Sequence, residues 1–174
     1  DYTGSNTAAS ILARLVAGAS PARLGVTEVV GRHITVRAGA SDTIAAPGHR
    51  LTLMLDVTPG SRIHVYAPGQ TGYIPIALTL DASPDYKVMT TTYPASTRYV
   101  FGPLKETVQV FAKPFRFTQD VTLTLTPAMR QRATNKETLT MSGHLEYQAC
   151  DDKVCFQPET LSLRWTISLT PIER

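Results

Sequence analysis

The chain has 174 residues, of which 43% are hydrophobic and 18% are charged. This length suits one domain, and the composition is apolar enough to bury a core without a structural metal or several disulfides. The formal net charge of +3 is carried by scattered side chains, which argues against a nucleic-acid surface. No stretch approaches the roughly 18 consecutive apolar residues of a membrane-spanning helix, so we expect no membrane insertion of this chain.

The first 25 residues differ in pattern from the rest. Their apolar side chains are spaced as on one face of a short helix: Ile11, Leu12, Leu15 and Val16. Residues 1–25 are therefore predicted to be a helical lead-in or a linker from an upstream domain, and residues 26–174 to be the main domain. The chain opens at Asp1 without a signal peptide, so we expect a mature or excised part of a longer protein.

From Val26 onward, short segments rich in β-branched and alternating apolar residues follow one another. Strands are predicted over residues 50–58, 62–66, 74–80, 86–91, 106–112, 115–126, 139–150 and 160–169. Turn residues separate them, as in Thr58-Pro59-Gly60-Ser61 and the polar stretch 130–136. Short strands without βαβ alternation predict an all-β, immunoglobulin-like β-sandwich, with a closed barrel as the alternative.

Cys150 and Cys155 are the only cysteines of the chain. They flank a four-residue loop, and residues opposite each other in a hairpin lie about 4.5–5.5 Å apart at Cα, within disulfide range. Closing about six residues restricts the unfolded chain by only roughly 2 kcal/mol, whereas a bond at a hairpin tip is open to an incoming thiolate. We therefore favour a redox-active dithiol/disulfide over a structural bond or another use of the pair.

Two further patterns bear on this pair. The four histidines lack the H-x₃₋₅-H spacing of zinc ligands, and the chain has no Gly-rich phosphate loop, so we expect neither a metal nor another cofactor. Asp151 and Asp152 adjoin Cys150, and their charge disfavours a thiolate there. This predicts a dithiol that is activated by docking with a partner, although the two aspartates equally suit a polar turn.

The residues around the cysteines resemble a known motif. Tyr147-Gln148-Ala149-Cys150, a short acidic loop, and then Cys155-Phe156-Gln157-Pro158 resemble the active-site hairpin of the N-terminal periplasmic domain of the thiol:disulfide interchange protein DsbD. Residues 62–66 resemble the strand that places aromatic residues beside the disulfide, with Tyr66 at the better-matched position and His64 where a tyrosine is common. Residues 93–104 resemble the segment with the cap loop, an aromatic cover over the cysteines.

This resemblance implies roles for individual residues. Phe101 is the first choice for the cap and Tyr99 the second, while ordinary core packing is the alternative for each aromatic side chain. Tyr147 and Phe156 flank the cysteines as neighbours in the site. In the family the second cysteine forms the mixed disulfide with partners, so Cys155 is expected to attack and Cys150 to resolve.

At the level of function, the resemblance implies a periplasmic or otherwise extracytoplasmic thiol:disulfide oxidoreductase domain. It relays electrons between thioredoxin-fold proteins, one of which is part of a membrane reductase or a fused redox domain. The competing interpretation is a non-catalytic immunoglobulin-like interaction module that carries a structural hairpin disulfide and is attached to a redox or transport protein. The redox behaviour of Cys150 and Cys155 distinguishes the two.

Overall fold

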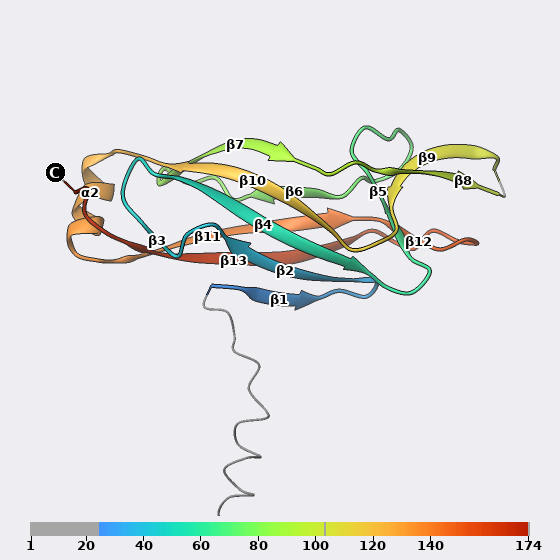
Figure 1. Cartoon of the computed structure of the whole chain (residues 1–174), viewed down its shortest axis with the longest axis horizontal. Coiled ribbons are helices and arrows are strands. Elements are labelled where there is room, and N and C mark those ends of the chain that lie inside the picture. The colour runs from blue at the N-terminus through green and yellow to red at the C-terminus, as the bar shows by residue number, and fades with distance from the viewer. Residues whose placement is uncertain (1–24, 103, 174) are drawn as a thin grey trace, which may run out of the picture.

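A computed structural model describes residues 25–102 and 104–173, and the strands within these residues form three sheets. In the first sheet every neighbouring pair of strands is antiparallel. Its strands, in spatial order, are β1 (Thr27–Val30), β2 (Ile34–Ala40), β4 (Arg50–Pro59), β10 (Phe115–Leu123) and β7 (Tyr86–Thr92). This sheet forms one layer of the molecule (Figure 1).

The second sheet forms the opposite layer of the sandwich. Its strands, in spatial order, are β3 (Ile44–Ala45), β13 (Glu159–Leu169), β11 (Thr138–Tyr147) and β6 (Ala77–Leu80). The long β11–β13 ladder runs in unbroken register from Thr138 opposite Ser168 to Tyr147 opposite Glu159. Strand β3 joins the edge of this sheet in parallel to β13.

The core lies between these two sheets and follows the alternation seen in the sequence. Every second residue of β4 is buried, as is every second residue of β13: Leu51, Leu53, Leu55 and Val57, and Leu161, Leu163, Trp165, Ile167 and Leu169. The indole N–H of Trp165 donates to the carbonyl oxygen of Gly39 at 3.0 Å, which ties β13 to β2 across the core. The predicted all-β, immunoglobulin-like sandwich is confirmed.

A third sheet extends from one end of the sandwich. Its strands, in spatial order, are β12 (Ala149–Cys150), β5 (His64–Tyr66), β9 (Glu106–Phe111) and β8 (Thr97–Phe101). Figure 1 shows β8, β9 and β12 at one end of the molecule and the helix α2 with the C-terminus at the other. The segment predicted to hold a cap loop therefore contains a strand, β8, which pairs antiparallel with β9.

A helix occupies a place where the sequence analysis expects only a polar turn. The helix α2 spans Pro127–Thr134, and the Thr126 hydroxyl caps it by accepting the backbone N–H of Met129 at 3.2 Å. Met129 and Ala133 are its buried residues, and they lie four apart on one face. So narrow an apolar face leaves no visible helical period, and the prediction of a turn over residues 130–136 was wrong.

The predicted strand over residues 139–150 is divided at Gln148. The part before this residue, β11, pairs with β13, and the part after it, β12, pairs with β5 in the third sheet. Alternation within one segment carries no information about such a change of partner. The predicted helical lead-in, residues 1–25, lies outside the described residues apart from Gly25. Among the described residues, no helix has the length and hydropathy needed to cross a membrane.

Candidate redox site

The two cysteines lie on a hairpin, residues 148–158, that leaves the β11–β13 ladder; we call it the cysteine hairpin. The side chain of Gln148 fixes its base. Its Oε1 accepts the backbone N–H of Ile74 at 3.3 Å, and its Nε2 donates to the carbonyl oxygen of Phe156 at 3.3 Å. Beyond this point, Ala149 pairs with Val65 and Cys150 with His64. The hairpin is therefore attached to the third sheet as well as to the second.

Cys150 and Cys155 are joined by a disulfide across this hairpin. They face each other as an antiparallel bridge, as predicted for a hairpin, with their Cα atoms 4.0 Å apart. This distance is shorter than the expected range of about 4.5–5.5 Å. In the loop between them, a carboxylate oxygen of Asp151 accepts the backbone N–H groups of Lys153 at 2.8 Å and Val154 at 2.7 Å. These two hydrogen bonds lower the pKa of Asp151. Asp151 thus shapes the turn, which is the second of the two roles considered for it.

The two half-cystines differ in their exposure. Cys150 is fully buried, with 0% of its surface accessible, whereas Cys155 is exposed. Thiol–disulfide exchange begins when a thiolate reaches one sulfur of the bond, and access decides which sulfur is attacked. The fold therefore offers the Cys155 side of the disulfide to an incoming thiolate and shields the Cys150 side.

The hydroxyl of Tyr66 touches both sulfurs. Its Oη lies 3.2 Å from Cys150 Sγ and 3.4 Å from Cys155 Sγ; since disulfide sulfurs carry no proton, the hydroxyl is the donor. The ring is 1% exposed and stacks on Tyr73, with their centroids 4.3 Å apart. Tyr73 in turn donates to a carboxylate oxygen of Glu106 at 2.5 Å. Burial raises the pKa of Tyr66 to about 12, so its hydroxyl keeps its proton at neutral pH.

His64 lies beside Tyr66 and Cys150. It is 4% exposed, and its ring centroid lies 4.4 Å from that of Tyr99 and 5.9 Å from that of Tyr66. Within the described part of the chain, its Nε2 is buried and has no hydrogen-bond partner. Burial lowers the pKa of His64 below its ordinary value of 6.5, and the negative charge of Asp151 partly opposes this shift.

The two candidate cap residues occupy different surroundings. Tyr99 and Phe101 point to the same face of β8, because alternate residues of a strand share a face. Tyr99 is half-buried and packs against the cluster formed by Tyr66, Val108, Val110 and Cys150. Phe101 is 8% exposed and pairs with Glu106 at the end of β8, outside that cluster. The structure thus brings the second choice, Tyr99, to the cysteine cluster.

Tyr147 and Phe156, predicted neighbours of the cysteines, pack against the main core instead. Tyr147 is completely buried in the sandwich, where its hydroxyl donates to the carboxylate of Glu159. Phe156 stacks on His33 with ring centroids 4.1 Å apart, and its backbone N–H donates to the carbonyl oxygen of Ala149 at 2.8 Å. Both side chains hold the base of the cysteine hairpin on the sandwich.

The family described as "Thiol:disulfide interchange protein DsbD, N-terminal" matches residues 36–166. The chain belongs to this family. Among solved structures, the N-terminal periplasmic domain of ScsB from Proteus mirabilis has a similar fold, with a TM-score of 0.56 at 14% sequence identity. That match covers 84% of this chain and 52% of the ScsB chain, so this chain spans about half the length of the ScsB chain. No curated protein matches.

As a DsbD N-terminal domain with a cysteine pair at disulfide distance, the chain is a thiol–disulfide exchange domain. Membership of this family also confirms the expected periplasmic or otherwise extracytoplasmic location. The matched residues fall within the main domain predicted over residues 26–174.

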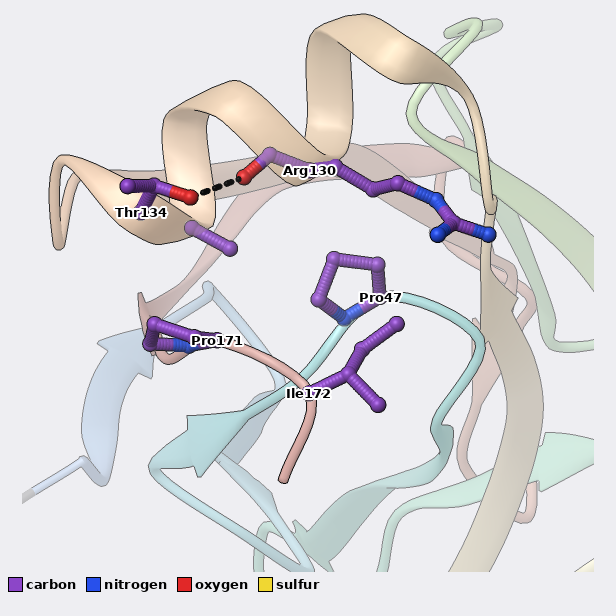
Figure 2. A pocket seen from close by; sticks show the side chains of 6 residues that line it. Pro47, Arg130, Thr134, Pro171 and Ile172 are labelled. Carbon is purple, nitrogen blue, oxygen red and sulfur yellow. Dashed lines mark hydrogen bonds between the residues drawn. The ribbon is translucent and has the colours of Figure 1, made fainter. Parts of the chain in front are cut away.

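Sequence reasoning missed two residues of this DsbD-type site. Tyr73 lies in a turn-rich stretch with no period, and Glu106 opens β9; both reach the site through tertiary contacts that no local pattern signals. No three or more His, Cys, Asp or Glu side chains gather as a metal site in the part of the chain that the structure describes. A shallow pocket beside α2, lined by Pro47, Arg130 and Ile172 (Figure 2), lies at the far end of the molecule from the cysteine hairpin.

Proposed function

We propose that this domain is a thiol:disulfide oxidoreductase that relays electrons between thioredoxin-fold proteins through Cys150 and Cys155. The observation that carries the proposal is the asymmetry of the disulfide: Cys155 is exposed, Cys150 is fully buried, and the Tyr66 hydroxyl lies within hydrogen-bond distance of both sulfurs. This arrangement suits a bond that opens at one defined sulfur and closes again through the other.

In the accepting half of the cycle, a thiolate of the reduced donor attacks Cys155 Sγ. The Cys150–Cys155 bond breaks, and its electron pair leaves on Cys150, whose thiolate receives the hydrogen bond of Tyr66. The donor's second thiolate then attacks the donor sulfur of the mixed disulfide, and Cys155 leaves as a thiolate. The donor leaves as a disulfide, and the domain retains two electrons as a dithiol.

In the donating half, the Cys155 thiolate attacks the disulfide of an oxidised acceptor. A mixed disulfide forms, and one acceptor sulfur leaves as a thiolate. The Cys150 thiolate then attacks Cys155 Sγ, which re-forms the internal disulfide and releases the acceptor as a dithiol. Summed over both halves, protons exchange with solvent, and the relay is proposed to work without a cofactor.

Partner docking is proposed at the end of the molecule that carries the cysteine hairpin. Strands β8 and β9 lie at the same end of the molecule as the cysteine hairpin (Figure 1). Large apolar side chains are exposed on both, namely Val100, Leu104 and Val154. A thioredoxin-fold partner, either a separate protein or part of a membrane reductase or fused redox domain, would cover these side chains and displace the aromatic cover.

An equilibrium titration of the Cys150–Cys155 pair against glutathione tests the proposal. A relay bond should be reduced and re-formed reversibly, with a potential above about −300 mV. Cys155→Ser should abolish electron transfer from reduced thioredoxin. Cys150→Ser, mixed with an oxidised thioredoxin-fold acceptor, should accumulate a mixed disulfide between Cys155 and that acceptor. A potential far below about −300 mV would identify a structural bond and favour the non-catalytic interaction module instead.

A further inference from the structure

The imidazole of His64 is an exception among the buried polar groups of this domain. Buried side-chain nitrogen and oxygen atoms nearly always have a hydrogen-bond partner, because an unpaired one loses its hydration without compensation. His64 is 4% exposed, and no residue in the described part of the chain pairs with its Nε2. The site thus holds an unused proton acceptor or donor in its interior.

The side chain of His64 lies on the face of the sheet that carries the disulfide. His64 is paired directly with Cys150 in the β5–β12 ladder, and the Cβ atoms of directly opposed residues lie about 4.5–5.5 Å apart. Tyr66, two residues further along β5, points to the same face and touches both sulfurs. The imidazole and the Cys150 sulfur are therefore neighbours on one face.

Cys150 needs a proton acceptor when the domain passes on its electrons. A thiol in buried, apolar surroundings ionises less readily than one in water, yet it must become a thiolate to attack Cys155. Tyr66 stays protonated up to a pKa of about 12, so its hydroxyl stabilises a thiolate but does not take up a proton at neutral pH. The hydroxyl of Tyr73 is engaged as the donor of a hydrogen bond to Glu106.

We propose that His64 accepts the proton of the Cys150 thiol when Cys150 resolves the mixed disulfide on Cys155; this rests on the electron-relay function proposed above. The proton passes from Cys150 Sγ to Nε2, which is an acceptor when Nδ1 carries the imidazole hydrogen. The thiolate attacks Cys155 Sγ, the Cys150–Cys155 bond forms, and the bond from Cys155 to the partner breaks. Its electron pair leaves on the partner sulfur, and the imidazolium returns its proton to that sulfur or to water.

The surroundings of His64 keep it in the form that this step requires. The titratable groups that face it are Tyr66 on its own strand, Tyr99 on β8, Cys150 on β12 and Asp151 in the cysteine hairpin. Burial favours the neutral ring more strongly than Asp151 favours the charged one. A neutral imidazole at neutral pH is a competent base, and Asp151 stabilises the imidazolium that forms.

The reaction of the reduced domain with Ellman's reagent separates the relevant steps. A first thiobenzoate is released when Cys155 attacks the reagent, and a second is released when Cys150 closes the internal disulfide. In the wild type, the rate of the second release should rise with pH through the pKa of His64, below 6.5, and then level off. In His64→Gln it should instead rise in proportion to hydroxide up to higher pH.

His64→Gln should slow the second release at pH 7 by at least about tenfold, since a positioned base contributes about 10²–10⁴-fold. The first release should be unchanged. His64→Phe keeps an aromatic ring against Tyr99 and should behave like His64→Gln, which separates proton transfer from packing. His144→Gln, on β11 in another sheet, is the matched control and should behave like the wild type.

Two results would overturn the inference in distinguishable ways. Rates of second release within about twofold of the wild type at every pH, in both His64 variants, would show that His64 takes no proton, while the relay function would stand. The absence of any second release in the wild type would show that Cys150 does not resolve the mixed disulfide. The relay function would then fail, and the role of His64 with it.

Discussion

At the scale of single residues, Tyr66 is the side chain that contacts both sulfurs of the disulfide. Its hydroxyl reaches both of them, its ring is held by Tyr73, and its pKa of about 12 keeps it a donor. A hydrogen bond to a thiolate is stronger than one to an uncharged disulfide sulfur. The hydroxyl therefore stabilises the reduced, ionised pair more than the oxidised one.

Tyr66→Phe should therefore slow the opening of the disulfide. Loss of the donor destabilises the departing Cys150 thiolate. A hydrogen bond to a fully charged group is worth about 1.5–3 kcal/mol, and Cys150 carries only part of its charge in the transition state, so we expect reduction by dithiothreitol to slow by about three- to tenfold. Tyr93→Phe removes a hydroxyl that donates to the carbonyl of Ile76 and is the control. An unchanged rate in Tyr66→Phe would contradict this role.

At the scale of elements, the β8–β9 hairpin lies against the cysteine cluster. Tyr99 packs on the cluster that contains Cys150, and Phe101 lies further along the same face. Sequence resemblance ranks Phe101 first for the cap, whereas the structure packs Tyr99 against this cluster. The order of the two aromatic residues depends on how β8 pairs with β9 and on how far that hairpin reaches over β5, and neither is written in the local sequence.

The cover can be tested on Cys150 alone in a Cys155→Ser background. Tyr99→Ala should speed the alkylation of Cys150 by iodoacetamide several-fold, because it removes a side chain packed against the cysteine cluster. Phe101→Ala is the matched variant, and an unchanged rate there would remove Phe101 as a cap. If neither variant alters the rate, the β8–β9 hairpin does not cover the cysteines.

Sequence reasoning succeeds or fails by element for physical reasons. Alternation predicts β4 and β13 well because one face of each is buried in the sandwich. It misses α2, where the Thr126 cap is the available signal. Within the site, the two cysteines and Tyr66 can be picked out from local sequence motifs. Tyr73 and Glu106 cannot, because they are brought to the site by tertiary contacts.

At the scale of the whole molecule, stability comes mainly from the sandwich and only in small part from the disulfide. Leu53 is fully buried between the sheets, and replacing such a residue by alanine costs about 2–5 kcal/mol. The disulfide closes only a short loop, and its loss costs roughly 2 kcal/mol in the loop-entropy model. The fold therefore has reason to persist in both redox states.

We accordingly expect the reduced domain to remain folded, with a free energy of unfolding about 2 kcal/mol below that of the oxidised domain. Leu53→Ala should lower this free energy by about 2–5 kcal/mol in either redox state. Leu125→Ala, at a position that is 54% exposed, is the control and should change it little. Urea unfolding followed by Trp165 fluorescence measures all of these. A reduced domain that is unfolded without urea would contradict the expectation.

The change of sheet at Gln148 has a consequence for how such a domain diversifies. Before that residue the chain is committed to the core through the β11–β13 ladder, and after it the chain rests on a two-residue pairing with β5 and on the amide of Gln148. The cysteine hairpin is thus attached to a sandwich whose core is complete without it. The length, charge and shape of this loop can therefore change to suit a different partner protein without altering the β-sandwich.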